Sequence, residues 1–282
     1  YYCRIRNYRH ILSYLASRKV NAKFILGLAS DLDIMNCRSR WKYLYTKNAK
    51  TLWLIFDGIV TEFVYPFLLR KSDYIFVQHA GQKKMLLQRG KKSLLFPNLI
   101  DPEEIPNCED PVRKEFVYVG RLDKRKGFLE FYHLVRNAPN HLFKVIGPPR
   151  HKEGYLLYEK FKSLPNVSLL GELTHKETLK EIANSIALIS TSPMEGFPNI
   201  FLEAWACGVP VLSLYVDPGD VIATENLGIV AHGNLALLLS EMNNVDNSID
   251  FEERARTYVM KNHILTHEKI KGINNLFNEI SH

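Results

Sequence analysis

Short apolar runs alternate with amphipathic segments along most of the chain, a pattern that predicts an α/β protein. In the first hundred residues it predicts helices over residues 8–18, 59–70 and 81–88, and strands over residues 22–29, 74–78 and 93–97. An irregular basic segment separates the first strand from the second helix. Residues 98–107 contain Pro102 and Pro106 and are typical of an interdomain linker.

A second alternating series follows this linker. It predicts strands over residues 116–120, 142–147, 167–170, 186–191 and 209–214, helices between them over 127–137, 153–163, 175–183 and 199–206, and closing helices over 251–262 and 267–280. Such alternation implies parallel sheets with helices on both faces and ligands at the carboxyl ends of the strands. We therefore expect two doubly wound domains, residues 1–101 and 102–248. The C-terminal helices, residues 249–282, are expected to cross back to the first domain.

Length and composition fit two hydrophobic cores. The chain has 282 residues, of which 46% are hydrophobic and 24% charged. The longest apolar stretch, residues 52–69, is interrupted by Asp57, Glu62 and Pro66, so we interpret it as a buried or interfacial helix rather than a membrane span. The four cysteines lie far apart and the histidines show no metal-ligand spacing. This argues against a disulfide framework or structural zinc and favours a cytoplasmic location.

Positive charge is concentrated in the first domain. Residues 1–100 hold 18 basic and 5 acidic residues, whereas the remainder holds 19 and 25. A basic surface of this kind can bind an anionic membrane or a phosphorylated acceptor, or it can simply be solvated. The first of these predicts a peripheral position at the inner face of the cell membrane. Since no nucleic-acid-binding motif accompanies the charge, we expect no nucleic acid as partner.

The most informative segment is residues 193–211, PMEGFPNIFLEAWACGVPV. It places Glu195 and Glu203 eight positions apart, across a loop that opens a short helix. Such a helix start offers backbone N–H groups and the positive end of the helix dipole to an anion. One turn inside the helix, Glu203 would repel phosphate but can accept hydrogen bonds from two neighbouring hydroxyls. Phosphate beside vicinal hydroxyls describes a nucleotide sugar.

This segment resembles the Glu-x7-Glu signature of the retaining family 4 glycosyltransferases, glycosyl transferases group 1 of GT-B fold. The resemblance runs through Gly-Phe-Pro-Asn-x-Phe-Leu-Glu-Ala-Trp-Ala-x-Gly-Val-Pro-Val and extends over residues 20–265, strongly in the second domain and loosely in the first. It implies two Rossmann-like domains facing a cleft, the first on the acceptor side and the second binding the donor. Nothing matches the glycine-rich strand–loop–helix that opens the family's first domain, so we expect that domain to be N-terminally incomplete.

A second motif follows the strand at residues 116–120. Gly120-Arg121-Leu122 and Lys126-Gly127 place two cations where they can straddle a diphosphate, or where they are simply solvated. They resemble the family's Gly-Arg-Leu…Lys-Gly, whose Arg and Lys hold the donor diphosphate and stabilise the leaving group. The resemblance therefore assigns catalytic roles to Arg121 and Lys126. Glu195 joins them, since the family's first Glu meets hydroxyls of the transferred sugar.

The resemblance also implies a donor-binding set. Glu203 would accept from both ribose hydroxyls, although a carboxylate in a first helical turn can also serve only the helix dipole. Backbone groups of the loop would contact sugar or phosphate, and the strand–glycine stretch over residues 167–173 would read the base edge. The expected donor-binding residues are Gly120, Gly171, Glu172, Leu173, Gly196, Phe197, Asn199, Ile200 and Glu203. Pro198 replaces a glycine of many relatives and removes one N–H donor.

Two further residues are candidates for the acceptor side. Asp31-Leu-Asp33 follows the strand at residues 22–29, and Asp-x-Asp binds a metal–diphosphate in the other large glycosyltransferase fold, GT-A. Because Arg121 and Lys126 already suit the diphosphate, we expect neither a metal nor a cofactor. Asp31 can instead take over part of the role of an acceptor-side histidine that many relatives carry. His79, which follows the strand at residues 74–78, is also expected near the cleft. A turn-capping aspartate and a packing histidine are the alternatives.

The sequence thus predicts a retaining glycosyltransferase that moves a sugar from a nucleoside diphosphate sugar to a hydroxyl of a glycan or lipid-linked acceptor. Assembly of a surface polysaccharide or glycolipid is the expected setting. One alternative is a non-catalytic fragment that binds a nucleotide sugar. Another is a GT-B-fold nucleotide-sugar epimerase, which lacks support because no suitable acid–base carboxylate pair is found.

Overall fold

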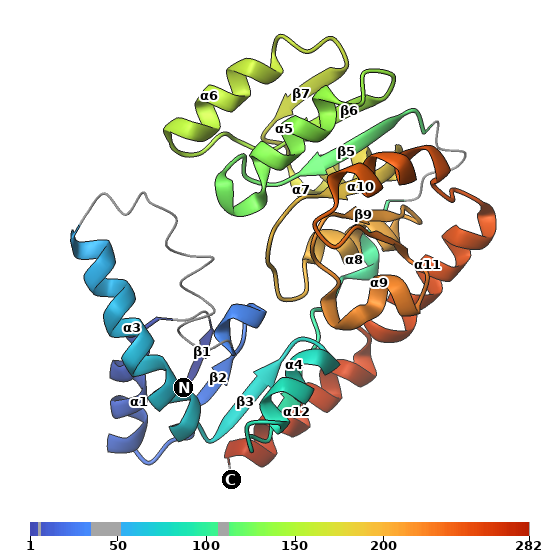
Figure 1. Ribbon diagram of the computed structural model, residues 1–282. Helices are drawn as coiled ribbons and strands as arrows, with labels where there is room; N and C mark the ends of the chain where they lie inside the picture. The colour runs from blue at the N-terminus through green and yellow to red at the C-terminus, as the bar shows by residue number, and fades with distance from the viewer. Residues whose placement is uncertain (5–6, 35–51, 107–112, 282) are drawn as a thin grey trace. The chain divides into compact units, whose positions relative to one another are not determined.

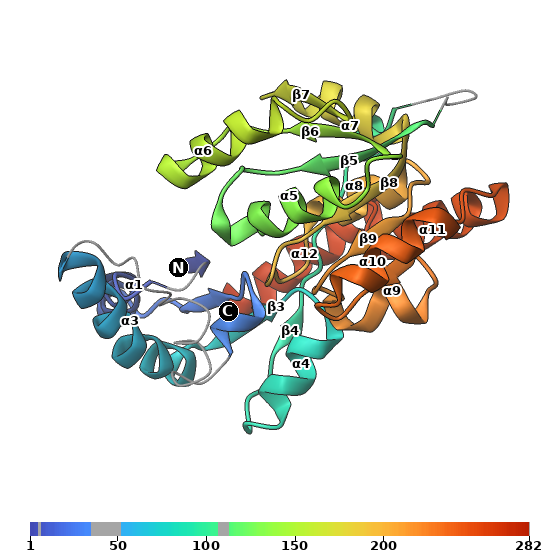
Figure 2. The ribbon, with the colours of Figure 1, turned by 45° about the horizontal axis from the view of Figure 1, so that its top comes forward.

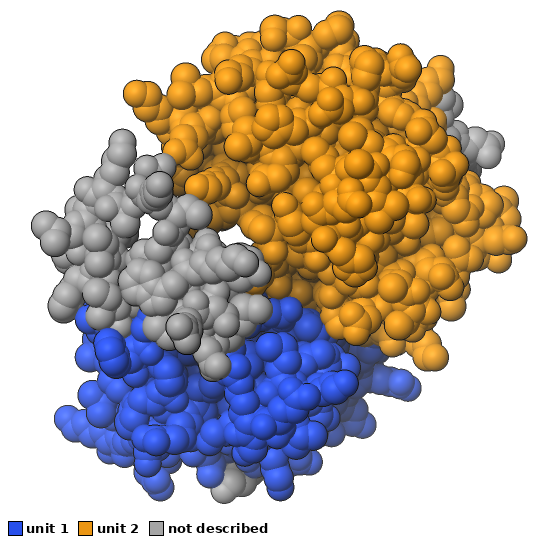
Figure 3. All heavy atoms as spheres, viewed as in Figure 1, with its two compact units in different colours: residues 1–98, 266–282 blue, residues 99–265 orange. Residues whose placement is uncertain are grey.

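The computed structural model describes residues 1–4, 7–34, 52–106 and 113–281. The chain forms two compact units, one of Tyr1–Asn98 with Thr266–His282 and the other of Leu99–Leu265 (Figure 3). Each is built around a parallel sheet (Figure 1). The predicted α/β fold with two doubly wound parts is therefore confirmed.

The first unit has a four-stranded sheet in the order β1-β2-β3-β4. The strands are β1 (Tyr2–Arg4), β2 (Ile25–Gly27), β3 (Tyr74–Val77) and β4 (Leu94–Leu95). Side chains alternate between its faces, as the strand period requires. Leu26 and Val77 face α1 (His10–Lys19), α3 (Leu52–Lys71) and α4 (Ala80–Leu87), whereas Ile25 and Phe76 pack against α12 (His267–Ser281).

The second unit has a six-stranded sheet in the order β10-β9-β8-β5-β6-β7. Its strands are β5 (Glu115–Val119), β6 (Leu142–Ile146), β7 (Val167–Gly171), β8 (Ser185–Ser190), β9 (Val211–Ser213) and β10 (Gly228–Val230). One face is covered by α5 (Phe128–Arg136), α6 (His151–Phe161) and α10 (Leu235–Glu241), the other by α7 (His175–Ala183), α8 (Asn199–Ala206), α9 (Val221–Thr224) and α11 (Ile249–Asn262) (Figure 2). Buried side chains of β5 alternate accordingly, with Val117 on the second face and Phe116 and Tyr118 on the first.

The strand order reverses between β5 and β8. On one side of β5 lie β6 and then β7. On its other side lie β8, β9 and then β10. The segments that leave β5 and β8 therefore diverge to opposite faces, which opens a crevice at their carboxyl ends. This edge carries both sequence motifs of the second unit.

Two glycines allow the loops at this edge to touch. Gly127 has φ +65° in the left-handed region, and a Cβ placed there would lie 1.9 Å from the carbonyl oxygen of Thr191, just after β8. The Thr191 hydroxyl also donates to the Gly127 carbonyl at 2.7 Å. At Gly147, after β6, a Cβ would lie 2.1 Å from the Gly120 carbonyl oxygen. Only residues without a side chain permit these approaches.

Some predicted elements are wrong in detail. The segment predicted as irregular before residue 59 is helical from Leu52, where α3 begins, and residues 35–51 of it lie outside the described residues. Residues 52–60 carry only one charge, Asp57, so their sequence shows no polar face with helical periodicity. The three-residue strands β1 and β10 were not predicted. β2 and β9 are equally short, but each lies within a longer apolar run that predicted a strand.

The unit boundary falls between Asn98 and Leu99, against the expected 101 and 102, and α11 and α12 belong to different units. Within the part of the chain that the structure describes, no helix has the length and apolar character to cross a bilayer.

The contact between Gly127 and Thr191 predicts a large stability difference between two glycine substitutions in the second unit. Gly171→Ala places a side chain at φ +72° in open space and should cost only backbone strain, about 1–2 kcal/mol. Gly127→Ala adds a steric clash and should cost about 3–5 kcal/mol. Native-state hydrogen exchange of the β5 and β8 amides measures both losses. Equal losses would show that the close approach does not constrain the fold.

Candidate active site

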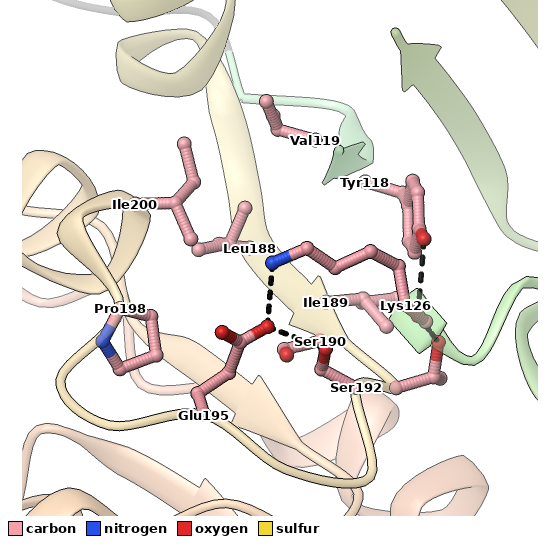
Figure 4. A pocket seen from close by; sticks show the side chains of 11 residues that line it. Tyr118, Val119, Lys126, Leu188, Ile189, Ser190, Ser192, Glu195, Pro198 and Ile200 are labelled. Carbon is pink, nitrogen blue, oxygen red and sulfur yellow. Dashed lines mark hydrogen bonds and ion pairs between the residues drawn. The ribbon is translucent and has the colours of Figure 1, made fainter. Parts of the chain in front are cut away.

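A pocket lies where β5 and β8 end, at the reversal of strand order (Figure 4). Strand residues form its floor, and the loops after them form its sides. The lining residues are Tyr118, Val119, Lys126, Leu188, Ile189, Ser190, Thr191, Ser192, Glu195, Pro198 and Ile200. Of the three predicted catalytic residues, the structure places two, Lys126 and Glu195, in this pocket.

The backbone of Lys126 is fixed by buried polar groups. The Asp123 carboxylate caps the short helix η3 (Lys124–Lys126) by accepting hydrogen bonds from the N–H groups of Arg125 at 3.0 Å and Lys126 at 3.2 Å. The Tyr118 hydroxyl donates to the Lys126 carbonyl at 3.1 Å. Burial raises the pKa of Tyr118 far above its usual range, so the hydroxyl remains a donor. The Lys126 ammonium group is thereby aimed into the pocket.

Glu195 meets this ammonium group across the pocket. Lys126 Nζ lies 2.5 Å from Glu195 Oε1, and the Ser192 hydroxyl donates to the same oxygen at 2.6 Å (Figure 4). A diphosphate entering the pocket would compete with Glu195 for Lys126. Both side chains are partly exposed, at 33% and 23%, so their ion pair contributes little stability and is displaceable. The carboxylate released in this way can accept hydrogen bonds from hydroxyl groups.

Arg121, the third predicted catalytic residue, does not line the pocket. Its side chain is half exposed and its Nε lies 4.0 Å from Asp123 Oδ2. The Asp123 carboxylate thus lies close to the Arg121 side chain and also accepts a hydrogen bond from the backbone N–H of Lys126. Neither Asp123 nor Ser192 was predicted from the sequence, although an aspartate just before a helix start is a recognisable capping signal.

Glu203 lies in a second pocket, of about 140 Å³. Asn199 and Glu203, four residues apart on one face of α8, line it together with His175 and Glu104. Pro198 and Ile200, by contrast, line the first pocket. Of the predicted donor-binding residues, Ile200 thus lines the first pocket, and Asn199 and Glu203 line the second.

The environment of Glu203 is mostly apolar. Burial raises the pKa of its carboxyl group, and the nearby His175 acts in the opposite direction. His175 Nε2 lies 3.4 Å from Glu203 Oε1. His175 was not predicted as a site residue, because a single histidine at a helix start is no recognisable signal.

The remaining donor-side predictions fall on backbone or packing positions. Gly120 donates its N–H to Ile146 at 2.9 Å, and the Gly171 carbonyl accepts from Gly147 at 2.6 Å. Gly196 is buried and Glu172 exposed. Leu173 and Ile200 pack against the core beneath α8. The Phe197 ring is buried, 4.9 Å from the His263 ring and 6.3 Å from that of Trp205.

In the first unit the structure brings Asp31 and His79 together. Asp31 Oδ1 lies 3.1 Å from His79 Nε2 and accepts from Gln82 Nε2 at 3.0 Å. Asp33 instead accepts from the backbone N–H groups of Ala29 and Ser30, so it caps the turn after β2. The two aspartates of Asp31-Leu-Asp33 thus have separate partners.

Comparison with known proteins identifies the family of the second unit. Residues 104–241 match the model of the family Glycosyl transferases group 1. The chain is 27% identical over 194 residues to an uncharacterized glycosyltransferase of Methanocaldococcus jannaschii, covering 60% of this chain and 47% of that protein. It is 29% identical over 154 residues to one subunit of human phosphatidylinositol N-acetylglucosaminyltransferase, covering 51% of this chain and 31% of the human protein.

A solved structure gives the fold. The chain superposes on a mutant of S. aureus TarM in complex with fondaparinux, α-GlcNAc-glycerol and UDP, with a TM-score of 0.71 and 16% identity, covering 98% of this chain and 55% of TarM. Residues 104–241 thus belong to the glycosyl transferases group 1 family, and the chain has the GT-B fold, as predicted. The chain spans 47% and 31% of the lengths of the two curated relatives.

The ion pair in the first pocket predicts that Glu195→Gln strengthens binding of a free diphosphate. The substitution frees Lys126 and removes a negative charge, so affinity for inorganic pyrophosphate should rise by up to about 1 kcal/mol, roughly fivefold. Isothermal titration calorimetry measures the pyrophosphate affinity of both proteins. Glu159→Gln, which breaks an exposed pair with Lys162 in the same unit, is the matched control and should change nothing. Weaker pyrophosphate binding by Glu195→Gln would contradict the competition.

Proposed function

We propose that the chain acts as a retaining glycosyltransferase that uses a nucleoside diphosphate sugar. The observation that carries this proposal is the contact between Lys126 and Glu195 beside the start of α8. An ammonium group suited to phosphate and a carboxylate suited to sugar hydroxyls lie at one point. The family of residues 104–241 supports the same reaction class.

The residues suit the charge that develops during transfer. When the bond between sugar and phosphate breaks, positive charge grows on the sugar and negative charge on the departing diphosphate. Lys126 and the positive end of the α8 helix dipole would stabilise the diphosphate. Arg121 would add a second, bidentate contact. Retention of configuration follows if the departing phosphate takes the acceptor's proton on the same face, which requires neither a separate base nor a metal.

The nucleoside would occupy the second pocket and the adjoining strand end. Glu203 would accept from the ribose hydroxyls, and the backbone over residues 171–173 would contact the base. The TarM structure contains UDP, which makes UDP the first nucleotide to test.

On the acceptor side, we assign Asp31 to an acceptor hydroxyl. Its Oδ1 is held by His79 and Gln82, both buried, so the orientation of the carboxylate is set within the first unit. The acceptor would be a glycan or a lipid-linked hydroxyl. The human relative, whose name contains phosphatidylinositol, supports the lipid-linked class.

The first unit also suits an anionic membrane surface. Residues 1–30 contain six basic and no acidic residues. Helix α1 exposes Leu12 and Leu15 together with basic residues at its end, Arg18 and Lys19. Exposed leucines beside cations are typical of helices that lie in a membrane interface. A peripheral position at the inner membrane face would place the protein beside a lipid-linked acceptor.

Binding measurements on pocket variants test the donor site. We expect the chain to bind one of UDP, GDP, ADP and dTDP in isothermal titration calorimetry. Glu203→Ala should weaken this binding by about 1–3 kcal/mol through lost ribose hydrogen bonds. Lys126→Ala should weaken diphosphate binding far more than binding of the free nucleoside.

Lys124→Ala, at an exposed position in the same short helix, is the matched control and should keep the affinity. No binding of any of the four diphosphates by the folded chain would contradict the donor site. Binding without transfer or hydrolysis of the sugar donor would favour the non-catalytic alternative, and interconversion of free donors would favour the epimerase.

Sedimentation with lipid vesicles tests the membrane proposal. The chain should bind phosphatidylglycerol vesicles, and high salt should release it. The double variant Leu12→Ser, Leu15→Ser should partition at least about tenfold more weakly, because two leucines no longer enter the interface. Leu129→Ser with Leu156→Ser, which removes exposed leucines of the second unit, is the control. Equal binding to phosphatidylcholine vesicles, or no effect of the α1 variant, would overturn the proposal.

A further inference from the structure

The second pocket presents a carboxylate in an unfavourable environment. The Glu203 side chain is 16% exposed. Apolar side chains form most of the wall around it: Leu99, Ile100, Ile105, Leu179, Ala206 and Cys207. Burial of this kind disfavours the ionised carboxylate. The ionised form is the one that can accept hydrogen bonds from two hydroxyls at once.

Two other titratable groups lie near Glu203, each from a different element. His175 is the first residue of α7, and Glu104 ends the short helix η2 (Pro102–Glu104). The imidazole lies between the two carboxylates, with Nε2 at 3.4 Å from Glu203 Oε1 and Nδ1 at 3.7 Å from Glu104 Oε2. Burial and the nearby Glu104 both raise the pKa of the Glu203 carboxyl group, and His175 lowers it.

The position of His175 is set by the start of its helix. Thr174 and Glu177 form a capping box, in which the Thr174 Oγ1 accepts from the Glu177 N–H at 3.3 Å and a Glu177 carboxylate oxygen accepts from the Thr174 N–H at 2.9 Å. This fixes the backbone on both sides of His175. The backbone of His175 is therefore held at the start of α7, from which its half-exposed imidazole reaches Glu203.

We propose that His175 is a positioning residue for the nucleoside: it keeps the Glu203 carboxylate ionised and oriented for the ribose hydroxyls, and Glu104 holds the imidazole from the other side. The proposal rests on the proposed function, because it takes Glu203 as the ribose-binding group. It adds a residue outside both motifs. It also makes nucleotide affinity depend on pH through a single histidine–carboxylate contact.

The sign of this dependence follows from the direction of the shift. Burial raises the pKa of Glu203, so its ionised form is lost as pH falls through that raised value. Without His175 the ionised form of Glu203 should be lost at a higher pH, because burial and Glu104 raise its pKa with no opposing effect. The ratio of dissociation constants between His175→Ala and the unaltered chain should therefore grow as pH falls towards the raised pKa of Glu203. Protonation of the diphosphate itself affects both proteins equally and cancels in the ratio.

Calorimetry on the whole chain tests the proposal, with whichever of UDP, GDP, ADP and dTDP binds. His175→Ala should weaken nucleotide binding about three- to tenfold at pH 8 and further at pH 6. His175→Gln keeps an N–H donor but cannot carry charge. It should restore affinity at pH 8 and retain less of it as the pH is lowered, because the effect of His175 that opposes the raised pKa of Glu203 is absent. Binding of inorganic pyrophosphate should be the same in all three proteins, because the first pocket is unaltered.

Lys176→Ala, at the next and exposed position of α7, is the matched control and should behave as the unaltered chain. A constant ratio between pH 8 and pH 6, or unchanged affinity in His175→Ala while Glu203→Ala loses binding, would overturn the role of His175 and leave the donor site intact. Failure of the unaltered chain to bind any of the four nucleotides would overturn the proposed function, and the role of His175 with it.

Discussion

The contact between the loop after β5 and the loop after β8 is the constraint on which the candidate site depends. Gly127 lies so close to Thr191 that a side chain could not fit, and the Thr191 hydroxyl bonds the Gly127 carbonyl. That contact brings Lys126 and Glu195, 69 residues apart in sequence, to within 2.5 Å of each other. Without it the two groups would be separate surface charges. The contact is possible because β5 and β8 are neighbouring parallel strands, so the loops that follow them begin side by side at one edge of the sheet.

Much of this arrangement could be predicted from local sequence. Apolar runs alternating with amphipathic segments gave the α/β class, and the residues around Lys126 and Glu195 gave the family. Local sequence patterns do not show which side chain each site residue contacts. The ion pair of Lys126 and Glu195, and the contact of Asp31 with His79, arise from strand order and loop packing across long separations. His175 could not be predicted for the same reason, because its importance lies in being next to Glu203.

The predicted element boundaries were wrong where the hydrophobic pattern showed no helical or strand periodicity. The start of α3 at Leu52 lies in a run with one charge, so nothing separated a buried from an exposed face. Strands β1 and β10 have three residues each and, unlike the equally short β2 and β9, were not recognised within a longer apolar run. Their neighbours in the sheet, rather than their own composition, determine that they are strands.

The first turn of α8 divides the site into two chemical halves. On one side, a lysine and a carboxylate hold each other where a diphosphate and a sugar would replace that contact. On the other, a largely buried carboxylate lies beside an imidazole from α7, which we propose keeps it oriented for the ribose. The eight-residue spacing of Glu195 and Glu203 accounts for this division, because one carboxylate precedes the helix and the other projects from its first turns. In the proposed function the two would contact different parts of one ligand.

A crystal structure of the chain with UDP tests this account most directly. We expect the β-phosphate within hydrogen-bonding distance of Lys126 Nζ, the Glu195 carboxylate displaced from Lys126, and the ribose hydroxyls on Glu203. A diphosphate bound elsewhere, with the contact between Lys126 and Glu195 intact, would contradict it.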